Sequence, residues 1–492
     1  MATTDNALRV INIVGAPIKM TGLHGRRRIR TAVREINRDN ILDVLAKALP
    51  THKANVDEIK YLWDYRRGIQ PVMGKTKTSR EDVNHKVIIN RAEEITSFKT
   101  GYLLGKPIQY TALDNTDDVL EQVSMLSRYI FYCNGASKDK RVAEWAYTCG
   151  VAYKMGLPNR EGGESPFTIT VPDPRMAFVV YSNSLDERPM MCVLTHTDED
   201  GNTIYDCYTA TRYYEITSGG SILESGVGMA ILREEANGLG MLPVVEYNMN
   251  MARMGAFEIV IDILDTINDT ESDRADAITQ FVQSLMVLHN VDMDTESYDE
   301  MIARGAVKIR DTDPSTKGEI TYITAVLNQA ETQVYINDLY KSMLTVCGMP
   351  NRNDGAGDNG VAVIYRDGWS TAEGKALDDE AMYKESEREF IRLLAKICNS
   401  TAGMNLNVAD IDIKFARGNY ENIQSKVQVL DEMLNNDKIF PKLAFEYSGM
   451  FSDPDLAYKL SKEYHESLQT STVSATEEED NADQAVTDET DD

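Results

Sequence analysis

The most strongly patterned part of the sequence runs from residue 325 to residue 400. Apolar side chains recur there at i, i+3 and i+4, which places them on one buried stripe of an α-helix. Gly348 and Pro350 are predicted to end the first helix, because glycine suits a helix C-terminus and proline cannot continue the helix. The residues expected on its buried stripe are Val334, Leu339, Met343 and Val346, with Ile336, Tyr340 and Cys347 beside them.

A polar loop is predicted to separate this helix from a second long one. Residues 351–360 contain no apolar side chain larger than alanine, so they cannot contribute to a core and are expected to form an exposed loop. Helical spacing resumes after residue 365 and continues to Cys398. The pattern therefore predicts two long helices with an exposed polar loop held between them.

Helical spacing also dominates the first 150 residues. Pro50 is predicted to end the first piece of the first helix, because proline lacks the N–H that a helix interior needs. A short strand is expected at residues 108–111. The helices are predicted at residues 40–65, 84–104, 117–133 and 138–152.

Between residues 166 and 247 the apolar period changes to two, which is typical of half-buried strands. Asp200-Gly201 lies between two of these strands and is a hairpin turn signal. A mainly antiparallel sheet in a helical chain of 492 residues indicates an α+β, multi-domain protein. The strands are predicted at residues 167–171, 176–181, 190–195, 205–209 and 213–216.

Beyond the sheet, a helix is predicted over residues 255–288, with apolar ends and an acidic middle. Its polar middle suggests a wet side. A small insertion is expected to follow it, and a clean alternating strand and three short helices are expected near the end of the chain. The predicted elements are a helix at 298–304, strands at 307–309, 320–323 and 411–415, and helices at 419–435, 441–447 and 453–466.

The formal net charge of the chain is −27. Residues 472–492 hold nine acidic and no basic residues, which leaves −18 for the rest, and this tail is predicted to be disordered. An acidic body repels phosphate, so tight wrapping of DNA on a basic surface is not expected. The charge is still compatible with a wall past which DNA slides.

A basic cluster near the N-terminus consists of Arg26, Arg27, Arg28 and Arg30, with Arg34 and Arg38 after it. It is interpreted as a solvated helix face, and the alternative is an arm that contacts nucleic acid or an acidic partner. The six cysteines form no CxxC pair and are expected to be reduced thiols of an intracellular protein without membrane association. The six histidines are scattered, and we expect no cofactor.

The acidic helix offers the one candidate for catalysis. Asp262, Asp265, Asp269, Asp273 and Asp276 recur at helical spacing, and carboxylates on one face can hold the two metal ions of a nuclease. The competing interpretation is a solvated or channel-facing side of an amphipathic helix, which we prefer because no third ligand group or basic DNA-binding surface is apparent nearby. A metal-dependent nuclease remains the alternative function.

Four motifs, in order along the chain, resemble those of portal proteins from tailed bacteriophages, and most of all those of long-tailed phages of Gram-positive bacteria. In the loop motif Asn359 stands where the family usually has serine, and the loop lacks the family's usual apolar residues. The resemblance covers roughly residues 84–466. The motifs are residues 90–111 with the turn Tyr102-Leu103-Leu104-Gly105-Lys106-Pro107, Asp262 to Asp265 followed by Ser272 and Phe281, residues 359–365, and Asp412 to Phe415.

This resemblance implies a non-enzymatic subunit of a closed ring, a dodecamer in the virion, at one vertex of the capsid. The alternative within the same setting is a phage head-associated enzyme, such as a nuclease, that uses the aspartate-rich helix. Double-stranded DNA would pass through its centre, and the ring would meet the terminase, the head–tail adaptor, and capsid and scaffolding proteins. The implied parts are an N-terminal arm (1–40), an α/β wing (41–254), a first stem helix (255–290), a clip (291–324), a second stem helix (325–347), a tunnel loop (348–360), a tunnel-wall helix (361–400), a return strand (401–418), a helical crown (419–470) and an acidic tail (471–492).

The resemblance also implies which residues face DNA. The loop chemistry, one arginine among Asn, Asp and Gly, suggests that Arg352 approaches the phosphate backbone without reading base sequence. The acidic stem face is expected to consist of Asp269, Glu271, Asp273 and Asp276. The DNA-facing loop residues are expected to be Met349, Asn351, Arg352, Asn353, Asp354, Gly355, Gly357, Asp358 and Asn359.

Overall fold

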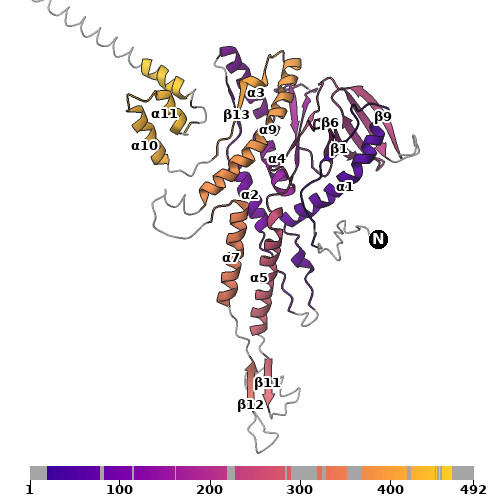
Figure 1. The fold of residues 1–492 in the computed structure, drawn as a ribbon, viewed down its shortest axis with the longest axis vertical. Coiled ribbons are helices and arrows are strands. Elements are labelled where there is room, and N and C mark those ends of the chain that lie inside the picture. The colour runs from indigo at the N-terminus through magenta and orange to yellow at the C-terminus, as the bar shows by residue number, and fades with distance from the viewer. Residues whose placement is uncertain are drawn as a thin grey trace, which may run out of the picture.

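The protein has a body of helices and sheets from which two long helices run side by side to a small hairpin, while a separate helical unit stands beside the body (Figure 1). The α+β, multi-domain prediction is confirmed. The computed structural model describes residues 19–20, 22–77, 83–113, 116–160, 162–218, 228–282, 285–289, 319–323, 329–351, 368–417, 423–448, 450–451, 454 and 457–467.

The larger sheet has six strands in the order β1-β5-β6-β7-β8-β9, and only the β1–β5 pair is parallel. Four of the predicted strands, β5 to β8, lie at its centre. The Asp200-Gly201 turn joins β6 to β7, where Gly201 takes a φ of +83° and Asp198 N donates to Asn202 O over 3.0 Å. The strands are β1 (Ile29–Thr31), β5 (Ala177–Ser182), β6 (Pro189–Thr197), β7 (Thr203–Tyr208), β8 (Arg212–Ser218) and β9 (Met229–Ala236).

Helix α1 (Ile41–Arg66) packs on this sheet and is continuous through Pro50, so the predicted break is wrong. The N-terminal half buries Ile41 and Leu45 against the sheet, and the C-terminal half buries Leu62 and Tyr65 in a second core cluster. Burial on both sides of the proline offsets the hydrogen bond that it removes.

A second layer surrounds helix α9 (Trp369–Thr401), whose Phe390, Ile391 and Leu394 lie at the centre of the largest core cluster. Residues 152–158 form a strand that the sequence analysis missed, and helix α2 begins at Arg91 instead of residue 84. This layer contains α2 (Arg91–Leu103), α3 (Asp117–Tyr132), α4 (Gly135–Cys149), a sheet of β10 (Val244–Tyr247), β3 (Ala152–Pro158) and β4 (Phe167–Thr170), and a pair of β2 (Gln109–Ala112) with β13 (Ile411–Lys414).

The two long helices are α5 (Ile261–Val282) and α7 (Gln329–Cys347). The predicted helix over 255–288 is too long, because residues 285–289 form strand β11 (Leu285–His289), which pairs antiparallel with the predicted strand β12 (Glu319–Ile323). A five-residue apolar run does not distinguish a helix end from a strand by periodicity. The predicted helix at 298–304 and strand at 307–309 lie outside the described residues.

Helix α7 buries only part of the stripe predicted for it. Val334 and Val346 are 60% and 48% exposed, whereas Met343 and Cys347 are buried. The buried residues are Ile336, Met343, Leu344 and Cys347. Much of the surface of α7, including two valines, therefore faces away from its own chain.

The last part of the chain is a small helical unit. It contains α10 (Ile423–Leu434), α11 (Pro441–Ser448) and helical residues 457–467, which we call the C-terminal unit (423–467). These elements agree with the three helices predicted there. The acidic tail from 472 lies outside the described residues.

Short 3-10 turns occur at Pro71–Gly74, Glu258–Val260 and Val408–Asp410.

Candidate functional site

The acidic helix predicted from the sequence is α5, and one stripe of its polar side is buried, although Asp269 and Asp273 are exposed. Asn268, Ser272 and Asp276 are almost completely buried, and Asp265 is buried as well. Their spacing of three or four residues puts them on one stripe of the helix. The buried polar stripe must therefore find hydrogen-bond partners within the protein.

Those partners come from an extended segment, residues 83–90, which we call the strap. The backbone N–H groups of His85, Val87 and Ile89 donate to Asp276 Oδ1 (2.6 Å), Ser272 Oγ (2.9 Å) and Asn268 Oδ1 (2.8 Å), in that order. The spacing of the donors along the strap matches the spacing of the acceptors along α5. Two residues of extended chain span about 6.6 Å, and four residues of helix span about 6 Å. Each bond satisfies a strap donor that has no strand partner.

Lysines outside the helix neutralise the acidic side of α5. Lys75 Nζ lies 2.7 Å from Asp273 Oδ1, Lys77 pairs with Asp276, and Lys19 Nζ lies 2.7 Å from Asp262 Oδ1. Burial raises the pKa of the Asp276 carboxyl, but hydrogen bonds from Lys77 and from His85 outweigh burial and hold that pKa well below its ordinary value. These lysines are paired with the aspartates of the helix.

The four predicted stem-face residues therefore have different environments. Asp269 and Asp273 are exposed, and partial burial together with the neighbouring Asp265 carboxylate raises the pKa of Asp269. Glu271 is half-buried beside Arg274, and Asp276 is buried under the strap. Asp276 is thus a structural residue rather than part of an exposed acidic face.

The predicted loop between α7 and α9 leaves and re-enters the body at nearly one point. Gly368, at a φ of +79°, precedes α9, and a Cβ placed on it would lie 3.9 Å from Pro350 Cα. Met349 was expected to face DNA, but it is 7% exposed, packs in a core cluster, and donates its N–H to Leu344 O over 2.8 Å. Asn351 ends the described stretch, and Arg352, Asn353, Asp354, Gly355, Gly357, Asp358 and Asn359 lie outside the described residues.

A buried ionic cluster fixes helix α9 to the body. Lys154 Nζ of β3 lies 2.6 Å from Asp139 Oδ1 of α4 and 3.0 Å from both oxygens of Glu387 on α9. The hydroxyls of Tyr110 and Tyr247 each donate to Glu387 over 2.7 Å. Burial, only partly opposed by Lys154, raises the pKa of Asp139 from its ordinary 3.8 to about 6. Five elements therefore meet at one charged point in the core.

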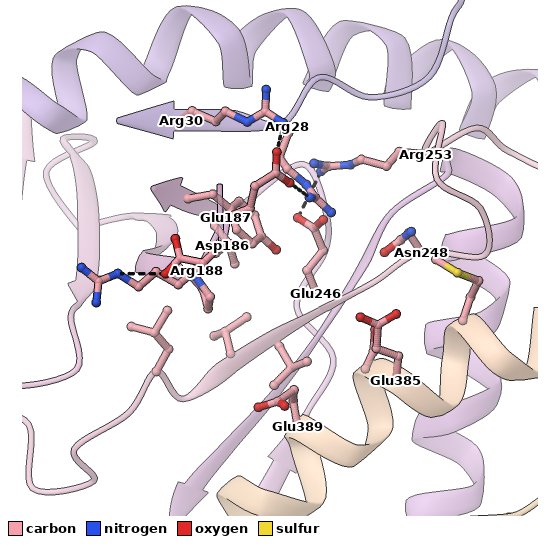
Figure 2. A pocket seen from close by; sticks show the side chains of 18 of the residues that line it. Arg28, Arg30, Asp186, Glu187, Arg188, Glu246, Asn248, Arg253, Glu385 and Glu389 are labelled. Carbon is pink, nitrogen blue, oxygen red and sulfur yellow. Dashed lines mark hydrogen bonds and ion pairs between the residues drawn. The ribbon is translucent and has the colours of Figure 1, made fainter. Parts of the chain in front are cut away.

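The N-terminal basic cluster lies beside a cavity of about 1330 Å³ (Figure 2). Arg28 and Arg30 both pair with Glu187, while Glu385 and Glu389 of α9 line the cavity away from them. The segment is extended and enters β1, so the interpretation as a solvated helix face is wrong. These arginines are paired with carboxylates of the same chain.

Arg26, the first residue of this cluster, is buried. Its Nη2 lies 2.6 Å from Glu258 Oε1 and its Nε lies 3.0 Å from Glu58 Oε2. It thereby joins the N-terminal segment to α1 and to the 3-10 turn that precedes α5. The sequence indicated charge here, but not the carboxylates that meet it, which lie far away in the chain.

Within the part of the chain that the structure describes, no three His, Cys, Asp or Glu side chains gather in a way that could hold a metal ion. None of the described helices combines the length and apolarity needed to cross a bilayer. All six cysteines are free thiols, and all but Cys133 are buried.

Comparison with known proteins places these features in a family. A solved structure described as the neck of an empty GTA particle, computed with C6 symmetry, contains a chain with 10% sequence identity and a TM-score of 0.44 to this one, and the match covers 73% of this chain and 90% of that chain. No curated protein matches the sequence. The family model described as phage portal protein, SPP1 Gp6-like, matches residues 45–479. The chain therefore belongs to the SPP1 Gp6-like family of phage portal proteins.

Proposed function

We propose that copies of this chain form a closed ring at one capsid vertex, a dodecamer in the virion, through which double-stranded DNA passes during packaging and ejection. The observation that carries the proposal is the pair α5–α7, which extends from the body and exposes Val334 and Val346. A closed ring of head-to-tail contacts covers such surfaces with the next copy. The family match over residues 45–479 supports the same assembly.

The loop over residues 348–360 is the proposed contact with DNA. Pro350, near its start, lies close to Gly368, the residue that precedes α9. Arg352 is its only cation, and each phosphate contact adds electrostatic affinity, so the loop touches DNA without holding it. The exposed Asp269 adds negative charge to α5, which further disfavours tight DNA binding.

The end of the long helices is the proposed docking site for other proteins. The β11–β12 hairpin lies at the far end of α5 and α7 from the body (Figure 1). In the assembled particle this end would meet the terminase during packaging and the head–tail adaptor afterwards, while the body would contact capsid and scaffolding proteins. The assembled ring would be a virion component, built in the host cytoplasm.

Native mass spectrometry and negative-stain imaging of the purified chain test the ring. We expect a mass that is an integral multiple of the subunit mass and a ring around a central hole. A monomer that cleaves DNA only in the presence of Mg²⁺ would overturn the proposal in favour of the nuclease.

Deletion of residues 351–360 tests the DNA contact separately. Because these residues follow the point at which the chain leaves the core, the deletion is expected to preserve ring mass while reducing DNA packaged per particle. Ring mass is the control for folding. Packaging at the wild-type level by intact mutant rings would refute the role of the loop.

A further inference from the structure

The C-terminal unit has very little core of its own. Among those of its residues whose burial the structure describes, which leaves out 423–425, only Ala444, Phe445 and Ser448 are buried, all on α11. Phe445 contacts Phe451 and Tyr458, with ring centroids 5.2 and 5.9 Å apart. A unit of this size buries too little apolar surface to be stable without additional support.

Helix α11 carries a second apolar stripe on its outer side. Leu443 and Tyr447, four residues apart, are 50% and 78% exposed, while Phe440, just before the helix, is 57% exposed and its ring centroid lies 5.8 Å from that of Tyr458. Leu443 and Tyr447 lie on a different side of the helix from the buried residues Ala444, Phe445 and Ser448. The helix is therefore apolar on two sides, and its own chain covers one of them.

The other helices of the unit also expose apolar side chains. Val427 and Leu434 are exposed on α10, and Leu460 and Tyr464, four residues apart, are exposed on the helical segment 457–467. Charged pairs at i and i+4, Lys442 with Glu446 and Lys462 with Glu466, share these helices. Apolar stripes next to charged side chains are the pattern of a protein interface with a polar rim.

We infer that these outer stripes pack against the C-terminal units of the two neighbouring copies, and that the unit becomes stable only when they do. A head-to-tail ring gives every subunit two different neighbours, so each unit needs apolar surface on more than one helix. The C-terminal unit exposes apolar side chains on all three of its helices. The inference rests on the proposed ring, but the ring can form through other parts of the chain without it.

Hydrogen exchange of residues 423–467 tests this inference on the full chain, with rings and monomers separated by size. Amides of α11 are expected to exchange about tenfold faster or more in monomers than in rings, because the neighbour's contribution to local stability is missing. Equal protection in monomers and rings would overturn the inference while leaving the ring proposal intact. Absence of any wild-type ring would overturn both.

A double variant tests the surface itself. Leu443→Ser with Tyr447→Ser removes two outer side chains without touching the buried stripe, and Glu446→Ser on the same helix is the matched control. We expect the double variant either to form rings whose α11 amides exchange as fast as in monomers, or to lose the ring while the control keeps it. Wild-type ring mass with wild-type protection in the double variant would refute the interface.

Discussion

Removal of Lys154 is expected to destabilise the protein strongly and in a pH-dependent way. The ammonium group is buried and contacts two buried carboxylates, Asp139 at 2.6 Å and Glu387 at 3.0 Å. Lys154→Met keeps much of the side-chain volume but leaves both acids without their counterion. Breaking a buried ion pair from one side costs about 3–5 kcal/mol, and that is the expected loss of unfolding free energy at pH 7.5.

The pH dependence follows from the pKa of Asp139, which is about 6 in the wild type, above its ordinary 3.8. A raised pKa means that the folded protein binds a proton more readily than the unfolded chain. The cost of burying the Asp139 carboxylate is therefore fully present above pH 6 and is relieved as pH falls toward 3.8. Lys154 lowers the pKa of Asp139, so its removal raises that pKa further. The variant then gains more stability than the wild type as pH falls from 7.5 to 5, and the deficit shrinks.

Urea unfolding followed by tryptophan fluorescence, at pH 7.5 and pH 5, measures both effects. Lys140→Met, which changes an exposed lysine on the same helix as Asp139, is expected to stay within about 0.5 kcal/mol of the wild type. The triple variant with Asp139→Asn and Glu387→Gln removes all three charges and is expected to recover part of the loss. A loss below about 1 kcal/mol for Lys154→Met, or an equal loss at both pH values, would refute the reasoning.

Burial lowers the pKa of His52 from 6.5 to about 4, so between these pH values the unfolded chain binds a proton that the folded protein does not. The free energy of unfolding therefore falls by about 3 kcal/mol as pH drops from 6.5 to 4. His52→Phe is expected to flatten that part of the pH profile of urea unfolding, and an unchanged profile would contradict the assignment. Gly150→Ala places a Cβ 2.0 Å from Arg253 O and is expected to lower the free energy of unfolding by about 3 kcal/mol or more. Gly201→Ala, at nearly the same φ but with open space around the Cβ, is expected to lower it by about 1 kcal/mol. Equal losses in thermal unfolding would show that the close contact is irrelevant. Asp276→Asn weakens the bonds to the strap and is expected to raise hydrogen exchange there about tenfold, and unchanged exchange would argue against its role.

Local patterns predicted much of the fold. The Asp200-Gly201 turn, strands β5 to β8 and the start of α11 at Pro441 follow from nearest neighbours along the chain, and the structure confirms them. Pro50 and strand β11 were misjudged for a common reason. In both cases contacts with other elements outweigh the local preference, and a single sequence does not show those contacts.

The candidate site was predictable only in part. The polar stripe of α5 was visible as a pattern, but its meaning depends on the strap: Ser272 meets Val87, 185 residues earlier in the chain. Extended residues without alternating hydrophobicity give no signal for such a partner. The arginine cluster was misread in the same way, because the carboxylate of Glu258 that pairs with Arg26 is 232 residues away.

The strap gives α5 a mechanical role. The N–H groups of three alternate strap residues engage three side chains on one stripe of the helix, and a one-residue step turns a helix by about 100°. A rotation of that size would break all three bonds together and leave buried polar atoms without partners. The three bonds therefore oppose a rotation of helix α5 about its axis relative to the strap.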